Sequence, residues 1–289
     1  MTKTILITGA TGAVSTALLA SLKGSKNKIR ALVRNETKAA ALKAQGIDVF
    51  TGDLEHPATL TKAFDGVDAA WILSPPGPRA PEQSSNAVWA CRQAGVSHIV
   101  RMSALGAAHN APTINSRLHA LSDREVAHSG IPYTIVKPHF FMQNLMMSAQ
   151  SVAKEGVMPF AMGEGKVGMV DVRDVGEFAA RVLTTGNHYG KTYDVTGPVS
   201  LSLAQVAEQL GTALKKTVKY VPVTVEQAIQ AMQAMGLDAF GLNMMTDYFN
   251  AYSNNWGDFT TNDYQNVTGK APRAFADFAH DFATAFGGK

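Results

Sequence analysis

The sequence has a single cysteine, Cys91, among its 289 residues, so an intrachain disulfide is impossible. Such sparse use of cysteine is typical of proteins in a reducing compartment, and we expect a cytoplasmic protein. No apolar run approaches the roughly 20 residues that a membrane-spanning helix needs, and the first residues have the pattern of a strand rather than of a signal peptide. Neither a disulfide scaffold nor a membrane protein is expected.

Clustered charge of one sign is also missing. The net charge is +3, the densest basic pair is Lys215-Lys216, and the other Lys and Arg residues are scattered. Nucleic-acid interfaces and polybasic membrane anchors need clusters. We therefore expect no nucleic-acid or membrane partner. We also expect no metal ion, and a monomer or homodimer that acts on a small molecule.

A glycine-rich loop follows the first apolar segment. Residues 5–7 predict a strand, residues 9–12 (Gly-Ala-Thr-Gly) follow, and residues 13–22 predict a helix. A pyrophosphate needs a turn without Cβ atoms, exposed N–H groups and the positive end of a helix dipole, and this unit offers all three. Ser15 stands where a third glycine is usual, but it is small enough for close helix–strand packing. The alternative is a tight turn without a ligand.

Strands and helices then alternate. Further strands are predicted over 29–33, 48–50, 69–73, 98–102 and 133–136, and further helices over 37–45, 60–64, 82–94 and 117–128. This order predicts an α/β fold, a Rossmann-type doubly wound parallel sheet with helices on both faces. Ligands of such sheets bind at the carboxyl ends of the strands.

The alternation thins beyond about residue 150. Strands are predicted over 166–171 and 191–195, and helices over 174–183, 203–214 and 224–235, without a Gly/Ser/Pro-rich linker. We predict a dinucleotide-binding domain over 1–150, completed by later segments at about 166–197. A smaller C-terminal α/β lobe over 151–289 is expected to bind the substrate.

Arg34, directly after the second strand, bears on the choice of nucleotide. NAD(H) sites usually place a carboxylate there for the ribose 2′-hydroxyl, whereas a guanidinium can pair with a 2′-phosphate. We therefore expect NADP(H) to be preferred, with NAD(H) possible, although a solvated Arg at a strand end is common. Asp53 is expected either to accept a hydrogen bond from the adenine amino group or to cap a short helix.

The residues at or beside the strand ends should converge on one crevice. The expected cofactor contacts are Gly9, Thr11, Gly12, Ala13, Val14, Arg34, Asp53, Leu54, Leu73, Ser74, Pro75, Ser103 and His139.

One catalytic element of ordinary short-chain dehydrogenases is missing. These enzymes use a Tyr-x-x-x-Lys pair on a helix, where positions i and i+4 share a face. Tyr133 and Lys137 match the spacing, but they lie in an apolar, β-branched run that Pro138 closes. We interpret this run as a strand and reject the pair.

The helix over 117–128 has neither the Tyr nor the Lys. Its polar candidates are Arg117, His119, Ser122, Asp123 and Glu125. His119 is the best candidate for proton transfer because its ordinary pKa lies near neutrality. Ser103 ends the fifth strand, where its hydroxyl could reach the nicotinamide or the substrate. The alternatives are a packing histidine and a strand-ending serine.

Taken together, these residues resemble the NmrA-like branch of the atypical short-chain dehydrogenase/reductases, from Ile5 to about Val223. Lys137 stands where that branch usually has Arg. The matching segments are 8–12, 31–35, 52–54, 118–119, 129–138, 140–145, 170–175 and 190–198.

The resemblance implies a Rossmann fold that binds NADP(H) without the Tyr/Lys pair. The branch includes quinone oxidoreductases, triphenylmethane and azo dye reductases, relatives that act on benzylic ethers and lignans, and redox-sensing regulators without turnover. It implies that His119 lies near the nicotinamide and that residues Pro138 to Phe141, including His139 and Phe140, line the ring. The benzylic ether reductases rely on a Lys there, for which we find no obvious counterpart.

Methionine and aromatic residues are expected to form the substrate pocket, with Phe141, Met142, Met235 and Tyr248 as the leading candidates. Such side chains adapt to flat conjugated ligands, although at helical spacing they are as often core residues. We predict a reductase that transfers a hydride from NADPH to an aromatic acceptor such as a quinone or a dye. The alternatives are a dinucleotide-sensing regulator and a reductase of benzylic ethers or lignans.

Overall fold

A computed structural model describes residues 2–35, 37 and 39–288. The helix predicted over 37–45 includes Lys38, which lies outside the described residues; its described part forms α2 (Ala39–Lys43). The chain divides into two compact units. Unit 1 comprises residues 1–111, 115–137 and 175–194, and unit 2 comprises residues 112–114, 138–174 and 195–289.

Unit 1 is built on a seven-stranded sheet in the order β3-β2-β1-β4-β5-β6-β9. Strands β1 to β6 pair in parallel. The strands are β1 (Thr4–Ile7), β2 (Lys28–Val33), β3 (Asp48–Thr51), β4 (Ala69–Ile72), β5 (His98–Met102), β6 (Tyr133–Pro138) and β9 (Lys191–Val195).

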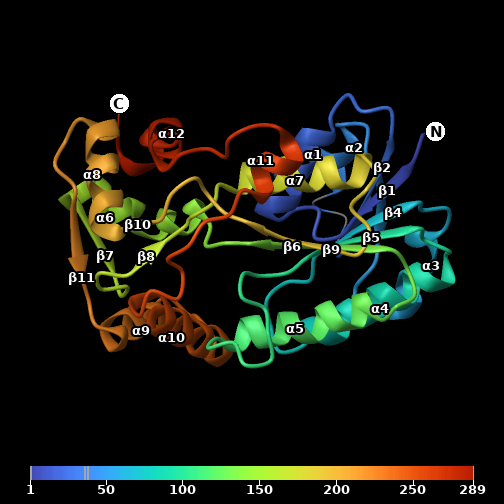
Figure 1. Cartoon of the computed structure of the whole chain (residues 1–289), viewed down its shortest axis with the longest axis horizontal. Coiled ribbons are helices and arrows are strands. Elements are labelled where there is room, and N and C mark those ends of the chain that lie inside the picture. The colour runs from blue at the N-terminus through green and yellow to red at the C-terminus, as the bar shows by residue number, and fades with distance from the viewer. Residues whose placement is uncertain (1, 36, 38, 289) are drawn as a thin grey trace. The chain divides into compact units, whose positions relative to one another are not determined.

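Helices cover both faces of this sheet (Figure 1). On one face lie α1 (Ala13–Leu22) and α7 (Val172–Thr184), and on the other lie α3 (Thr61–Phe64), α4 (Ala80–Gln93) and α5 (Ile114–Ala127). Because both faces are covered, β4 is buried throughout and carries an uninterrupted apolar run. The strand order is that of a Rossmann fold, so the predicted doubly wound α/β class is confirmed.

Helix α1 approaches the sheet closely at Ser15. This side chain is fully buried, and its hydroxyl donates to the Thr8 carbonyl at 3.1 Å and accepts from Trp71 Nε1 at 3.2 Å. The Thr8 hydroxyl in turn donates to the Leu73 carbonyl at 3.0 Å. Serine at the third position of the loop therefore preserves the close packing and adds hydrogen bonds to it.

Unit 2 contains two small sheets and several helices. β7 (Val157–Phe160) pairs in parallel with β11 (Lys219–Pro222), and β8 (Lys166–Val167) pairs antiparallel with β10 (Leu201–Ser202). Its helical elements are η3 (Met142–Ser148), α6 (Ala149–Glu155), α8 (Leu203–Leu214), α9 (Val225–Ala234), α10 (Ala239–Ser253), α11 (Asp263–Thr268), α12 (Phe275–Asp281) and η4 (Ala283–Phe286). A core of Met, Phe, Leu and Val side chains holds these elements together.

The strand predicted over 166–171 is wrong beyond Val167. β8 belongs to a two-stranded sheet instead of the main one, and Gly168 donates its N–H to the Gly257 carbonyl at 3.1 Å. A Cβ on Gly168 would lie 2.2 Å from the Phe259 carbonyl oxygen, so another loop occupies the space of a neighbouring strand. The apolar pattern is the same for such a buried loop as for a strand.

The two units interleave along the sequence. Segment 138–150, which we placed in the first domain, belongs to unit 2, and so does segment 166–174. Segment 175–194 belongs to unit 1, where β9 forms an edge of the sheet. Chain order alone therefore does not separate the units.

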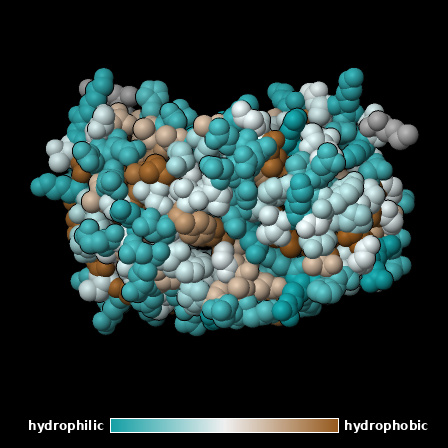
Figure 2. Space-filling view, in the orientation of Figure 1, coloured by the Kyte–Doolittle hydropathy of each residue, from teal (hydrophilic) through white to brown (hydrophobic). Residues whose placement is uncertain are grey.

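The surface carries scattered apolar side chains. On the face in Figure 2, hydrophilic residues dominate and hydrophobic ones occur in small patches. Among the described residues, no helix has both the length and the apolar character needed to cross a membrane.

Gly176 of α7 gives a test of this packing. Its Cβ would lie 2.6 Å from backbone atoms of Ala17 and Leu18 in α1. Gly176→Ala should therefore lower the free energy of unfolding by about 1–3 kcal/mol, although alanine favours helices. Urea unfolding checks this. Gly186→Ala is the control, because no atom lies within 4 Å of its Cβ position; an equal loss there would contradict the packing argument.

Candidate cofactor cleft and histidine cluster

A cleft of about 320 Å³ lies at the carboxyl ends of β1 to β4. It brings together eight of the predicted cofactor residues: Gly9, Thr11, Gly12, Arg34, Asp53, Leu54, Leu73 and Pro75. Six further residues line it that the sequence did not single out: Ala10, Leu32, Val33, Gly52, Pro76 and Gln83. Most of these are direct neighbours of predicted residues, so the strand ends were the informative signal.

The glycine loop makes a cradle that side chains would fill. Gly9 has a φ of +58°, and a Cβ there would lie 2.8 Å from Leu73 Cδ2. Gly12 is the N-cap of α1 and donates its N–H to the Gly9 carbonyl at 2.9 Å. The open N-terminus of α1, with its positive dipole end, suits an anion, so the loop fits a dinucleotide pyrophosphate.

Arg34 supplies the positive charge of the cleft. Its side chain is exposed, and the described part of the chain provides its guanidinium with no hydrogen-bond or ion-pair partner. An unpaired guanidinium in a cleft can bind a phosphate in bidentate fashion. Asp53 lies at the same edge, where its Oδ1 accepts the Glu55 N–H at 3.0 Å in an Asx turn.

Three predicted cofactor residues of unit 1 lie beside the cleft without lining it. Ala13 and Val14 form the first turn of α1, and Val14 is buried. Ser74 is also buried, and its hydroxyl is 3.1 Å from that of Ser84.

Ser103 and His119, the two predicted catalytic residues, belong to one cluster in unit 1, in which Ser103 is buried and His119 is half-buried. The Ser103 hydroxyl donates to Asp123 Oδ2 at 2.7 Å. Arg101 Nε lies 3.2 Å from Asp123 Oδ1, and Arg101 Nη2 is 3.2 Å from His119 Nδ1. The structure therefore links both candidates through Arg101 and Asp123.

Burial dominates the electrostatics of this cluster. It lowers the pKa of His119 to about 3, and the positive charges of Arg101 and Lys137 add to the effect. Burial also raises the pKa of Asp123, against the opposing influence of Arg101, Ser103 and Lys137. His119 is consequently uncharged at neutral pH.

Lys137 was rejected as half of a Tyr/Lys pair, but its side chain lies close to the same cluster. It lies in β6 as predicted, and four residues of strand separate it from Tyr133 by roughly 13 Å, so the two cannot act as a pair. Its Nζ, however, donates to the Ala107 carbonyl at 3.2 Å and is 3.9 Å from Asp123 Oδ2. Lys137 therefore belongs to the histidine cluster.

The predicted ring-lining residues after β6 lie in unit 2. Pro138 is the buried end of β6, and Phe140 is half-buried. His139 uses both ring nitrogens: Nε2 is 3.0 Å from the Gly257 carbonyl, and Nδ1 accepts the Phe140 N–H at 2.6 Å. Burial lowers the pKa of His139 to about 4.

The predicted substrate residues differ widely in exposure. Phe141 is half-buried, and Met142 is 1% exposed in the core of unit 2, whereas Met235 is 73% exposed next to α9. Tyr248 is half-buried and stacks on Tyr252 with ring centroids 5.7 Å apart. The accessible candidates are thus Phe141, Met235 and Tyr248.

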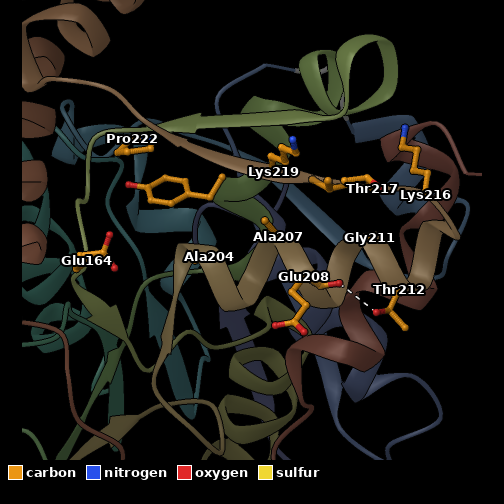
Figure 3. Close-up of a pocket in the computed structure, with 12 residues that line it drawn as sticks. Glu164, Ala204, Ala207, Glu208, Gly211, Thr212, Lys216, Thr217, Lys219 and Pro222 are labelled. Carbon is orange, nitrogen blue, oxygen red and sulfur yellow. Dashed lines mark hydrogen bonds between the residues drawn. The ribbon is translucent and has the colours of Figure 1, made fainter.

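A second hollow, of about 700 Å³, lies between α8 and β11 in unit 2 (Figure 3). Its charged side chains have both signs: Glu164, Glu208, Lys216 and Lys219. Lys216 Nζ already donates to the Val152 carbonyl at 2.8 Å. None of the predicted site residues lines this hollow, and its mixed charge selects no ligand class.

The buried histidines generate a pH prediction. Burial lowers the pKa of His98 to about 4, as it does for His139, and that of His119 to about 3. The unfolded chain therefore binds three protons near pH 5.5 that the folded chain does not, so the free energy of unfolding rises with increasing pH and falls as the pH is lowered. We expect a slope of about 3–4 kcal/mol per pH unit near pH 5.5.

Urea unfolding between pH 5 and 7.5 measures this slope. His139→Gln should reduce it by about a third, because one of the three proton-binding sites is removed. His128→Gln is the control, because that side chain is on the surface end of α5. A free energy of unfolding that does not change with pH in the parent chain would contradict the prediction.

Comparison with known proteins agrees with this geometry. The model of the NmrA-like family matches residues 1–264. An NAD(P)H azoreductase of Xenophilus azovorans is 37% identical over 283 residues, which cover 98% of this chain and 99% of that protein.

Two solved structures have the same fold. NADPH-dependent quinone oxidoreductase 2 of Escherichia coli, in complex with NADPH, matches with a TM-score of 0.87 and 30% identity over 96% of this chain and 99% of its own. Citrobacter sp. triphenylmethane reductase, in complex with NADP(H), matches with a TM-score of 0.87 and 26% identity over 97% and 99%. The resemblance found in the sequence is confirmed, and the chain belongs to the NmrA-like family.

Proposed function

We propose that this chain is an NAD(P)H-dependent reductase that transfers a hydride from NADPH to an aromatic acceptor such as a quinone, an azo dye or a triphenylmethane dye. The observation that carries the proposal is the cleft of unit 1, in which a glycine cradle and the exposed guanidinium of Arg34 occur together. The named activities of the azoreductase, the quinone oxidoreductase and the triphenylmethane reductase support the same class of reaction.

The cleft residues divide the binding of the dinucleotide between them. The loop over 9–12 and the N-terminus of α1 hold the pyrophosphate, and Arg34 pairs with the 2′-phosphate of NADPH. NAD(H) lacks that phosphate and would lose the pairing, so we propose a preference for NADP(H) with NAD(H) still able to bind. Asp53 and Leu54 flank the adenine side.

The nicotinamide of the bound dinucleotide supplies the hydride. Quinones and cationic dyes are already electrophilic, so the chain can dispense with the Tyr/Lys pair. Of the two candidate catalytic residues we favour His119, because its Nε2 is not the nitrogen that contacts Arg101. Ser103 is 1% exposed and its hydroxyl already donates to Asp123, which favours a supporting role.

The acceptor is proposed to contact half-buried aromatic and methionine side chains of unit 2. Phe140 and Tyr248 both pack against the Tyr252 ring, which gives flat apolar surfaces at the edge of the core. Such surfaces suit conjugated rings better than sugars or small hydroxy acids. Met142 would support these residues from the core rather than contact the acceptor.

Arg34→Ala tests the choice of nucleotide. Loss of a charge-assisted phosphate pair should weaken NADPH binding about 10- to 100-fold and leave NADH binding almost unchanged. Calorimetric titration with both dinucleotides measures this. Arg92→Ala, at the exposed end of α4, is the matched control and should change neither affinity; equal losses for NADPH and NADH in Arg34→Ala would remove the NADP(H) assignment.

Turnover separates the reductase from a regulator that only senses the dinucleotide. NADPH consumption should rise on addition of quinones, azo dyes or triphenylmethane dyes, as followed by the loss of NADPH absorbance. Tight binding of NADPH without turnover across the whole panel would reject the reductase and favour the regulator.

A further inference from the structure

Arg101 is a fully buried guanidinium in the middle of the parallel sheet of unit 1. A buried charge is costly unless every donor has a partner. Nη1 donates to the Met102 carbonyl at 2.6 Å, Nη2 lies 3.2 Å from His119 Nδ1, and Nε forms an ion pair with Asp123 Oδ1 at 3.2 Å without the geometry of a hydrogen bond. One nitrogen of the guanidinium, Nη2, thus contacts His119.

The contact with Arg101 decides which nitrogen of His119 carries the hydrogen. A guanidinium has five N–H donors and no acceptor, so the Nδ1 that faces it must present a lone pair. The hydrogen of a neutral imidazole then resides on Nε2. A protonated His119 would instead direct an N–H at the guanidinium, which the geometry opposes.

Asp123 holds the guanidinium in this orientation. Its carboxylate faces Arg101 through Oδ1 and accepts the Ser103 hydroxyl at 2.7 Å through Oδ2. Lys137 Nζ from β6 approaches the same oxygen to 3.9 Å. The charged groups around His119 are therefore Arg101 of β5, Lys137 of β6 and Asp123 of α5, and the two cations oppose protonation of the ring.

We propose that Arg101 is a positioning residue that locks His119 in the uncharged Nε2–H form, so that His119 stabilises the reduced acceptor by a hydrogen bond and does not transfer the proton itself. A neutral imidazole that gave up its Nε2 hydrogen would become an imidazolate, which is far too basic to form near neutrality. The hydride adds its electron pair to the acceptor, His119 Nε2–H bonds to the oxygen or nitrogen that becomes anionic, and water supplies the proton. The role of His119 in turnover rests on the proposed reductase function, whereas its tautomer does not.

The tautomer is measured directly by NMR. Long-range ¹H–¹⁵N spectra of the labelled full-length chain, with His119 assigned by comparison with His119→Gln, should show one form with hydrogen on Nε2 and none on Nδ1 between pH 5 and 9. His128, directly after the same helix, is the internal reference, because its Nδ1 lies 2.9 Å from the Arg124 carbonyl and must carry the hydrogen. A protonated His119, or hydrogen on its Nδ1, would overturn the inference whatever the activity.

Kinetics test the positioning role. With a quinone and NADPH, His119→Phe should lower kcat about 100-fold, whereas His119→Gln, which keeps an N–H donor, should lose less than about 10-fold. Arg101→Met should lower kcat about 10-fold with little change in the KM for NADPH, and its pH profile should gain an inflection that the parent chain lacks. Equal loss in His119→Phe and His119→Gln would overturn the hydrogen-bond role.

Arg101→Met leaves Asp123 with a weaker partner and can fail to fold. The double variant Arg101→Met/Asp123→Asn removes both charges together and serves as the alternative, with the same NMR readout. In either folded variant, His119 should lose its single tautomer; retention of the pure Nε2–H form would contradict a role for Arg101. If the parent chain has the expected tautomer but turns over no acceptor, the proposed reductase function fails while the assignment of the tautomer stands.

Discussion

The site of this protein depends on how closely the first helix approaches the first and fourth strands. Thr8 and Ser15 connect α1, β1 and the end of β4 by buried hydrogen bonds, and Gly9 leaves no room for a side chain beside Leu73. On the same face of the sheet, Gly176 lets α7 approach the backbone of α1 closely. These contacts fix the N-terminus of α1 at the carboxyl ends of the strands, a position that suits the binding of a pyrophosphate.

A second constraint comes from charge inside the sheet. Arg101 stands in a central strand, where burial would be prohibitive without the Asp123 carboxylate and the Met102 carbonyl. The same guanidinium that needs these partners also restricts His119. The side chains that compensate the buried charge of Arg101 therefore belong to the same arrangement that restricts His119.

Much of the fold could be predicted because its signals are local. The bounds of α1, β5, β9 and α8 agree with the predicted ranges, since apolar runs end at turn residues and α8 begins with a capping box at Ser202 and Gln205. The short β7 and β11 were missed, because Pro159 and Pro222 argue against strands. The strand over 166–171 failed because burial in a loop has the same apolar pattern.

The site was predictable only in part, because only some of its residues are brought together by local signals. Residues after strand ends converge in any parallel sheet, so Gly9, Arg34 and Asp53 could be grouped without coordinates. Arg101 and Lys137 could not be joined to His119, because their proximity depends on the register between β5 and β6 and on the placement of α5.

The transfer of deuterium from NADPH labelled at C4 to the central carbon of a triphenylmethane dye tests the central claim most directly. Direct hydride transfer predicts one deuterium in the leuco product from only one of the two C4 diastereomers, as measured by mass spectrometry, whereas no deuterium, or equal transfer from both, would contradict it.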